Sequence, residues 1–392
     1  MHTVDAAGLA IGDDQPPRIM GVLNVSKESP YDPSVYDEPD EAAAYVDEEL
    51  IGEGAHIVDV GLESANKRLD VLSAEQELDR LATAVETMES VSGDAVFSIE
   101  TRYAEVAEAA LDAGFDMVND ICGFADPAMP EICREYDVAV GKMASPPDLE
   151  RPGAIDDVDW VAARSPEWAE QADYVDRVYE ALTQNGLTEK TIVDPAFGGW
   201  SERKTLEDDR ATFRRLREFR GFGQPILVSI NRKNFLRSLA DRSTEEALPV
   251  SLAATSMAIE RGAHVVRTHD VAETLDAAKI GGAFTERGRT VEGDVTVSEL
   301  DVRTAGDVAR HLDRIGAGEA DGEPFVGRVF ELSGVAPSAV ERLDAAAVDT
   351  GAVVRSGPDG VLVGGSLAEL SALAGVIDDE ATADALVRAI EA

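Results

Sequence analysis

The sequence is poor in basic residues, in cysteine and in long apolar runs. Of its 392 residues, 77 are acidic and only 35 are Lys or Arg, so the formal net charge is −42. The two cysteines, Cys122 and Cys133, do not make a disulfide framework or a metal site. No apolar stretch is long enough to cross a membrane, and the N-terminal residues do not have the pattern of a secretory signal. We therefore expect a cytoplasmic protein without a membrane partner.

The acidic residues are spread through most of the chain, and only seven of the basic residues are lysine. Such a surface repels itself at low salt. Near 1 M salt the screening length falls to about 3 Å, from about 10 Å at 0.1 M, so concentrated salt would suppress this repulsion. The composition is therefore typical of a salt-adapted, halophilic protein, and an ordinary acidic protein is the alternative. Nucleic acid is not an expected partner, because phosphate backbones bind to basic faces.

Short apolar runs, rich in β-branched residues, alternate with longer amphipathic stretches from residue 18 to about 282. Several of these stretches end in Gly, as helices commonly do, and the alternation predicts parallel strands with helical crossovers. Eight such units match the size of a (β/α)8 TIM barrel. A doubly wound open sheet is the alternative, although no GxGxxG motif follows the first strand. The expected strands are 18–24, 56–61, 95–101, 116–121, 137–143, 191–195, 225–231 and 264–270.

The pattern changes after residue 285. A polar, Gly-containing joint is followed by mixed strand-like and helix-like segments, with a hairpin turn signal at "GPDG". We expect an N-terminal extension at 1–17, the barrel at 18–285, and a small C-terminal α/β module at 286–392. The module has no cluster of catalytic residue types, and its sequence does not indicate a role.

Polar side chains stand at the end of every expected strand. Helix N-capping explains any single Asn, Asp, Ser or Thr at such a position, but capping does not require Lys, Arg or His. The active site of a TIM barrel lies at the C-terminal ends of its strands, so these residues are expected to meet at one rim. They are Asn24; Asp59, with Glu63 and Ser64 beyond it; Glu100 and Thr101; Asn119 and Asp120; Lys142; Asp194; Asn231, Arg232 and Lys233; and Arg267, His269 and Asp270.

These rim residues include two chemical groups. One group offers donors and acceptors that suit a flat, nitrogen-rich heterocycle; it comprises Glu100, Asn119, Asp194 and Lys233. The other suits an anion, because Arg binds phosphate through two parallel bonds and an Asn oxygen can ligate Mg²⁺; it comprises Asn24, Ser26, Arg267 and His269. For the segments "NRK" and "RTHD", a solvated surface patch is the alternative.

Six segments resemble, in order and spacing, the successive motifs of dihydropteroate synthase. They span roughly residues 17–282 and read "IMGVLNVSKES", "IVDVGLES", "SIETRYAEVAEAALDAGFDMVNDICG", "VDPAFGG", "SINRKNF" and "HVVRTHDV". Members of this family are TIM barrels that join 6-hydroxymethyl-7,8-dihydropterin diphosphate to p-aminobenzoate and release diphosphate, usually as homodimers with Mg²⁺. The resemblance implies that this chain is a transferase of folate biosynthesis with the same substrates, cofactor and oligomeric state.

The resemblance also implies roles for seven rim residues. Asn24 would contact the metal and the diphosphate. The pterin would be held by Glu100, Asn119, Asp194 and Lys233, and the leaving diphosphate by Arg267 and His269. Of these residues, Asp194, Lys233 and Arg267 would be catalytic.

The sequence departs from the family mainly around the acceptor. Glu100 replaces the usual Asp, Ala65-Asn66-Lys67 replaces a Thr-Arg-Pro loop that helps to enclose p-aminobenzoate, and Asn234 stands where a Ser usually follows the Lys. The segment 196–205 also differs, so the identity of the amine acceptor stays open. Two alternatives are a pterin-dependent methyltransferase, which would not need the diphosphate contacts of Arg267 and His269, and a non-catalytic paralogue.

Overall fold

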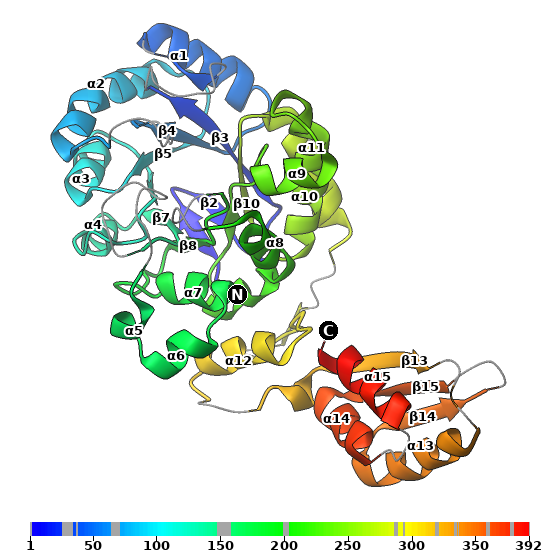
Figure 1. Ribbon diagram of the computed structural model, residues 1–392. Coiled ribbons are helices and arrows are strands. Elements are labelled where there is room, and N and C mark those ends of the chain that lie inside the picture. The colour runs from blue at the N-terminus through cyan, green and yellow to red at the C-terminus, as the bar shows by residue number, and fades with distance from the viewer. Residues whose placement is uncertain are drawn as a thin grey trace. The chain divides into compact units, whose positions relative to one another are not determined.

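The computed structural model describes residues 2–25, 34–36, 38–63, 71–146, 158–198, 204–285, 289–292, 295–317, 321–332, 335, 337–357, 361–376 and 380–391. The chain forms two compact units, Met1–Gly288 and Arg289–Ala392 (Figure 1). No helix in these ranges is long and apolar enough to cross a membrane.

Eight parallel strands form the sheet of the first unit, in the order β8-β7-β6-β5-β4-β3-β10-β9. A bridge between Val193 and Ile226 joins β8 to β9, so the sheet closes into a barrel. Every strand lies within one of the eight expected runs, which confirms the TIM barrel over the open sheet. The strands are β3 (Arg18–Asn24), β4 (Ile57–Gly61), β5 (Val96–Thr101), β6 (Met117–Asp120), β7 (Ala139–Met143), β8 (Thr191–Asp194), β9 (Leu227–Val228) and β10 (Val265–Thr268).

Helices surround this barrel (Figure 1). Capping boxes start several of them; at α2, for example, Ser73 and Gln76 cap each other's backbone amides. The helices are α1 (Pro39–Tyr45), continued by the π-helix η2 (Val46–Ile51), α2 (Ala74–Ser90), α3 (Ala104–Asp112), α4 (Met129–Glu135), α5 (Trp160–Ala163), α6 (Pro166–Gln171), α7 (Tyr174–Ala181), α8 (Leu206–Arg214), the 3-10 helix η3 (Leu216–Phe222), α9 (Asn234–Ala240), the 3-10 helix η4 (Glu245–Ala247), α10 (Leu248–Glu260) and α11 (Val271–Ala283).

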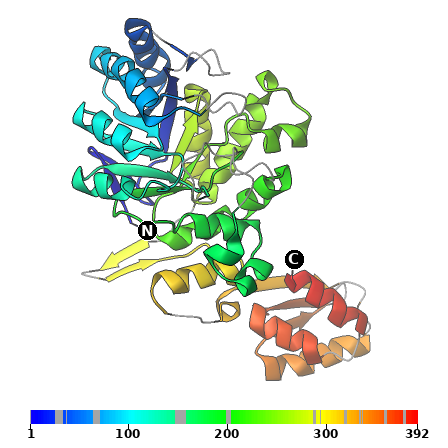
Figure 2. The same cartoon turned by 60° about the vertical axis from the view of Figure 1, so that its left-hand side comes forward.

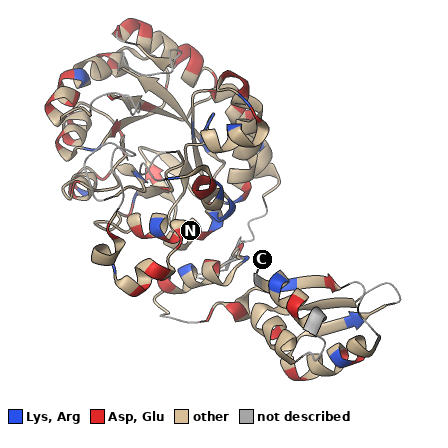
Figure 3. Ribbon diagram, viewed as in Figure 1, with Lys and Arg blue, Asp and Glu red and all other residues tan. Residues whose placement is uncertain are grey.

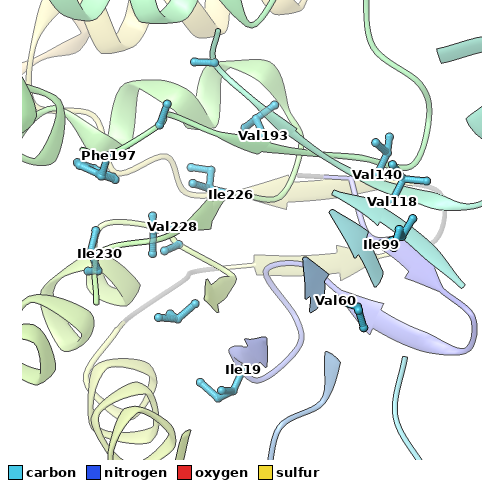
Figure 4. Close-up of a cluster of buried hydrophobic side chains, with 14 of the residues drawn as sticks. Ile19, Val60, Ile99, Val118, Val140, Val193, Phe197, Ile226, Val228 and Ile230 are labelled. Carbon is cyan, nitrogen blue, oxygen red and sulfur yellow. The ribbon is translucent and has the colours of Figure 1, made fainter. Parts of the chain in front are cut away.

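The largest apolar cluster lies between the strands and the helices. Residues such as Val60, Ile99, Val118 and Val140 point outward from successive strands into this layer (Figure 4). Burial of apolar surface stabilises a fold by roughly 25 cal/mol per Å², so this layer is the main source of barrel stability. It fixes the positions of the strand ends that carry the polar residues.

The N-terminal residues form a hairpin of β1 (Val4–Ala6) and β2 (Leu9–Ile11) that closes the bottom of the barrel. Val4, Ala6 and Ile11 are fully buried in one cluster with an inward side chain from each of the eight barrel strands. These strand residues are Met20, Ile57, Val96, Met117, Ala139, Ile192, Leu227 and Val265. The segment expected as an extension is therefore part of the barrel core.

Asp13 fastens the segment after this hairpin to the bottom of the barrel. Its two carboxylate oxygens accept bonds of 3.0 and 3.1 Å from Arg220, and Oδ1 lies 3.1 Å from Nε2 of His264. Nδ1 of His264 accepts the amide of Ile226 at 3.1 Å, so the proton of a neutral imidazole is on Nε2 and is donated to Asp13. These bonds hold the pKa of Asp13 well below its usual range and outweigh the opposing effect of burial.

The second unit contains the hairpin of β11 (Arg289–Glu292) and β12 (Val295–Ser298), α12 (Ala305–Arg314), the 3-10 helix η5 (Glu323–Phe325) and a three-stranded antiparallel sheet in the order β13-β15-β14. The sheet strands are β13 (Gly327–Leu332), β14 (Val353–Ser356) and β15 (Val361–Ser366). The helices α13 (Pro337–Thr350), α14 (Leu367–Val376) and α15 (Glu380–Glu391) cover one face of this sheet (Figure 2). Acidic residues are spread over the helices of both units (Figure 3).

Candidate functional site

Side chains along each barrel strand alternate between the interior and the helix layer, and this alternation selects the residues that face the site. On β5, Val96 belongs to the bottom cluster of the interior, whereas Phe97 and Ile99 pack among the helices. Ser98 and Glu100 therefore face the interior. The same alternation turns all seven residues proposed from the sequence inward or places them directly above the strand ends.

Arg267 on β10 lies at the centre of a buried polar network. Its Nε donates to Oδ2 of Asp59 at 2.7 Å, and its terminal nitrogen Nη2 donates to Oε2 of Glu100 at 2.6 Å. Nδ2 of Asn119 donates to the same Oδ2 of Asp59 at 2.9 Å. Asp59, which is fully buried, thus joins β10 to β6 across the interior of the barrel.

The charged groups of this network shift one another's pKa values. Burial alone would lower the pKa of Arg267, but the carboxylates of Glu100 and Asp59 outweigh burial and raise it. Burial raises the pKa of Glu100, although the nearby Arg267 opposes that shift. Arg267 therefore stays a cation, and Glu100 is the member of the pair that can take up a proton.

Asn24 ends β3 beside Gly61, at the end of β4. Its Nδ2 donates to Oγ of Ser34 at 3.1 Å. A Cβ atom on Gly61 would lie 2.9 Å from Oδ1 of Asn24 and 3.6 Å from Oε1 of Glu100. The absence of a side chain at Gly61 therefore allows an amide oxygen and a carboxylate oxygen to lie above the same point of the rim.

Asp194 and Lys233 occupy the side of the rim formed by β8 and β9. Oδ1 of Asp194 accepts the amide of Ala196 at 2.8 Å. Burial raises the pKa of Asp194 to about 6, against the lowering effects of that amide and of Lys233. Burial, followed by the charge of Arg267, lowers the pKa of Lys233. The charge of Lys233 thus favours the ionised form of Asp194, and the carboxylate of Asp194 favours the protonated form of Lys233.

A second buried ion pair, between Lys204 and Asp209, stabilises this side of the rim. Nζ of Lys204 donates to the carbonyl of Ala196 at 2.6 Å and to Oδ1 of Asp209 at 2.7 Å, and Asp209 also accepts the amide of Gly198 at 3.0 Å. Gly198 has a φ of +83°, and a Cβ atom there would lie 3.0 Å from Cδ of Lys233. Lys204 and Asp209 thus hold the turn from Ala196 to Gly198, and the side chain of Lys233 packs against this turn at Gly198.

The residues around His269 have two different environments. Burial first, and then the charge of Arg267, lower the pKa of His269 to about 3, so its imidazole is neutral. Asp270 accepts two bonds of 2.8 Å from Arg232 and one of 2.8 Å from Asn231. The "NRK" and "RTHD" segments therefore contain an ion pair that ties the end of β9 to the end of β10, rather than a solvated patch.

The expectation that every polar strand end faces the site is wrong for several residues, because the alternation turns them outward. Asp120 caps its own loop by accepting the amides of Cys122 and Phe124 at 2.8 and 2.7 Å. Lys142 donates to the carbonyls of Gln184 and Gly186. Thr101, which is also turned outward, donates to Glu77, whereas Glu63 lies in the loop beyond β4 and pairs with Arg102. Ser26, Ser64 and 65–67 lie outside the described residues.

Sequence reasoning did not give Asp59 or Lys204 a role. Asp59 lies two residues before Gly61, and its inward position follows only from the phase of the alternation along β4. Lys204 belongs to a segment without a clear counterpart in the family, and its function becomes visible only through its bonds to Ala196 and Asp209.

Comparison with known proteins agrees with this arrangement. Residues 20–269 match the family of pterin binding enzymes. The chain is 30% identical over 300 residues to dihydropteroate synthase of Bacillus subtilis, a match that covers 74% of this chain and 99% of the relative. The chain belongs to the dihydropteroate synthase family. The resemblance seen in the sequence motifs is thereby confirmed.

Two further relatives place the family match within the chain. A "probable bifunctional folylpolyglutamate synthase/dihydropteroate synthase" of Halobacterium salinarum is 34% identical over 267 residues, which are 68% of this chain but only 31% of that protein. The crystal structure of dihydropteroate synthase from Clostridium difficile, in the presence of pteroic acid, has a TM-score of 0.58 and 26% identity, and the match covers 70% of this chain and 99% of that one. The pterin-binding match ends before the second unit begins.

Proposed function

We propose that the barrel joins 6-hydroxymethyl-7,8-dihydropterin diphosphate to p-aminobenzoate and releases diphosphate, as a transferase of folate biosynthesis. The observation that carries this proposal is the position of Arg267, held by two carboxylates at the same rim as Asn119 and Asp194. A guanidinium at this point suits a substrate that carries both a pterin and a diphosphate. A pterin-dependent methyltransferase would have no use for it.

At the pterin end, Asp194 and Asn119 provide acceptors for the ring. Asp194 is ionised at neutral pH, and a carboxylate can accept two parallel N–H bonds from an amino-pyrimidinone edge. The bond from Nδ2 of Asn119 to Asp59 fixes the amide so that its oxygen lies beside Gly141, where a Cβ atom would be 2.9 Å away. Lys233 adds a donor on the same side.

At the diphosphate end, the methylene carbon of the substrate exchanges its bond to a diphosphate oxygen for a bond to the amine nitrogen. The arylamine nitrogen forms a bond to the methylene carbon while the bond from that carbon to the diphosphate oxygen breaks, and the electron pair leaves with the diphosphate. A neutral arylamine is already a nucleophile, so the attached proton can pass to solvent afterwards. Arg267 stabilises the charge that develops on the leaving group, and the neutral imidazole of His269 donates one bond.

Asn24 is suited to share in holding a Mg²⁺ ion. Because its nitrogen is bonded to Ser34, its oxygen lies at the rim above Gly61. Mg²⁺ commonly takes one or two protein oxygens together with substrate phosphates and water. No group of three or more His, Cys, Asp or Glu residues in the described part of the chain forms a complete metal site, so substrate oxygens would have to finish the coordination. When bound, the ion would offset the charge of the leaving diphosphate.

We also propose that the enzyme is a homodimer in a salt-rich cytoplasm. A shallow apolar groove between α10 and α11 supports the homodimer; it is lined by Leu252, Ala253, Ser256, Glu273, Asp276, Ala277 and Ile280. Met257 and Ile280, on the same two helices, are 45% and 57% exposed. The net charge of −42 supports a salt-rich surrounding.

The direct test incubates the full chain in molar KCl with the pterin diphosphate, Mg²⁺ and p-aminobenzoate, and measures dihydropteroate. A methyltransferase would instead bind a reduced folate and form none. Asn119→Ala should weaken binding of pterin and pterin diphosphate alike. Arg267→Lys, which keeps a cation beside the two carboxylates, should weaken mainly the diphosphate form. A hydrogen bond to a charged group contributes about 1.5–3 kcal/mol, so each loss should be about tenfold to a hundredfold.

Arg164→Ala is a suitable control for these variants, because this side chain is 54% exposed and lies outside the rim network. It should leave both affinities unchanged. Equal losses for both ligands in both rim variants would contradict the roles proposed for Asn119 and Arg267.

A further inference from the structure

The second unit exposes one whole face of its sheet. Alternate residues of β13, β14 and β15 point to opposite sides, and Phe330, Val354 and Val363 pack with the helices α13–α15. On the other side, Val329, Val353 and Leu362 are 73%, 52% and 50% exposed. No described segment of the second unit covers this face.

The exposed face has an ordered pattern across its three strands. In one row, Val329 and Val353 flank Gly364, and a Cβ atom on Gly364 would lie 3.5 Å from Cγ2 of Val329. In the next row, Glu331 and Arg355 flank Leu362. Both rows are therefore centred on β15, and the charged row has an acid on one edge strand and a base on the other.

Glu331 and Arg355 are suited to pair with other groups rather than with each other. They stand two strand spacings apart, which is about 10 Å. The structure has no ion pair between them, and Nη1 of Arg355 bonds instead to its own backbone, at the carbonyl of Val354 (2.6 Å). Arg355 is exposed, and its side chain has no carboxylate partner within the described region.

We propose that this face packs against the same face of a second copy of this chain, about a two-fold axis parallel to β15. Such an axis places β13 over the partner's β14. Val329 then meets the partner's Val353, Leu362 meets the partner's Leu362, and Glu331 meets the partner's Arg355. The face is thus complementary to itself in its apolar and charged residues, which favours a second copy over an unrelated partner. The proposal does not depend on the function of the barrel.

The size of the face predicts a weak association. Three strands of four to six residues supply less than the roughly 800 Å² per partner of a standard interface. The overall charge of −42 opposes the approach of two copies at low salt. Association should therefore strengthen with salt, because at molar salt the screening length is about 3 Å and the long-range repulsion is suppressed.

The test cross-links Leu362→Cys in the full chain, in molar KCl, with a short bifunctional maleimide. The two native cysteines are almost completely buried, so the introduced thiol reacts selectively. The matched control is Val348→Cys, which is 83% exposed on α13, a helix of the covered face. We expect a covalent dimer in several-fold higher yield from Leu362→Cys than from Val348→Cys, and a lower yield when KCl is reduced.

A charge exchange tests the pairing itself. In the Leu362→Cys background, Glu331→Arg alone and Arg355→Glu alone should each lower the yield, and the two changes together should restore it. Equal yields at positions 362 and 348 would overturn the proposal, as would failure of the double exchange to restore the yield. Protection of the thiol at position 362 from a monofunctional maleimide, in protein too dilute to give a cross-linked dimer, would also overturn it, because the face would then be covered by the chain's own residues.

Discussion

The charge of Asp194 is expected to lower the stability of the fold and to favour pterin binding, and both effects can be measured. The residue is only 5% exposed, and burial raises the pKa of its carboxyl from 3.8 to about 6. At about 1.36 kcal/mol per pKa unit, a shift of about two units makes the ionised carboxylate cost about 3 kcal/mol of folding free energy. Because the folded-state pKa is raised, this cost is fully present above about pH 6 and disappears below about pH 4, where folded and unfolded chains are both protonated.

Asp194→Asn removes the charge and keeps an oxygen for the amide of Ala196. At about pH 8 the ligand-free variant should melt several degrees higher than the wild type, because 1 kcal/mol corresponds to about 2–4 °C in domains of 150–250 residues. The difference should shrink as the pH falls toward about 5. Pterin affinity should change in the opposite direction, since a carboxamide cannot accept two parallel N–H bonds.

Thermal unfolding in molar KCl and pterin titration at both pH values measure these two effects. Asp79→Asn is the matched control, because it removes the same charge from an exposed side chain on α2 and so reports any general relief of the acidic surface. A ligand-free Asp194→Asn protein that is less stable than the wild type at about pH 8 would refute the reasoning, as would a stability gain that is equal to that of the control or independent of pH.

Three further predictions concern the surface, the barrel floor and the acceptor. When KCl is lowered from molar to about 0.1 M, the protein should unfold cooperatively or lose activity, because the screening length roughly triples; an unchanged melting temperature would contradict this. Asp13→Asn should lower the free energy of unfolding by about 1.5–3 kcal/mol in denaturant titrations, because it weakens charged bonds to Arg220. Because the pKa of Asp13 is lowered, the wild type should lose this stability progressively as the pH falls below about 4. Equal stability of both proteins near neutral pH would contradict the stabilising role of the bonds between Asp13 and Arg220. Because Ala65-Asn66-Lys67 replaces the usual acceptor loop, the KM for p-aminobenzoate should be higher than is typical of the family and sulfonamides should inhibit weakly; tight inhibition in a sulfonamide titration would show an intact acceptor pocket.

The barrel was predictable because its strands are buried on both faces. Parallel strands of this kind read as continuous apolar runs, and the helices between them have their own period, so the eight units can be found from the sequence. The N-terminal hairpin could not be recognised in this way. Its strands have three residues each, too few for a pattern, and its burial depends on the eight strand residues that meet it at the bottom of the barrel.

The site was predictable in its residue types and less so in its geometry. The same continuous runs that reveal buried strands hide the phase of the alternation, so Asn119 and its neighbour Asp120 look equivalent in the sequence. In the structure, Asn119 reaches Asp59 in the interior, whereas Asp120 caps a loop on the outside. Lys142 and Lys233 also look alike in the sequence, but Lys142 is fully buried on the outside of β7, whereas Lys233 is half-buried at the start of α9.

The interior contacts also connect the pterin group and the anion group of the rim. Arg267, expected to bind the anion, is bonded to Glu100, expected to bind the pterin, and shares Asp59 with Asn119. We expect a diphosphate that approaches Arg267 to compete with Glu100 for the guanidinium and to leave that carboxylate able to accept a bond from the pterin ring. A pterin without a diphosphate has to separate the same ion pair without compensation. The two halves of the substrate should therefore bind cooperatively, through the carboxylate of Glu100 that is bonded to Arg267.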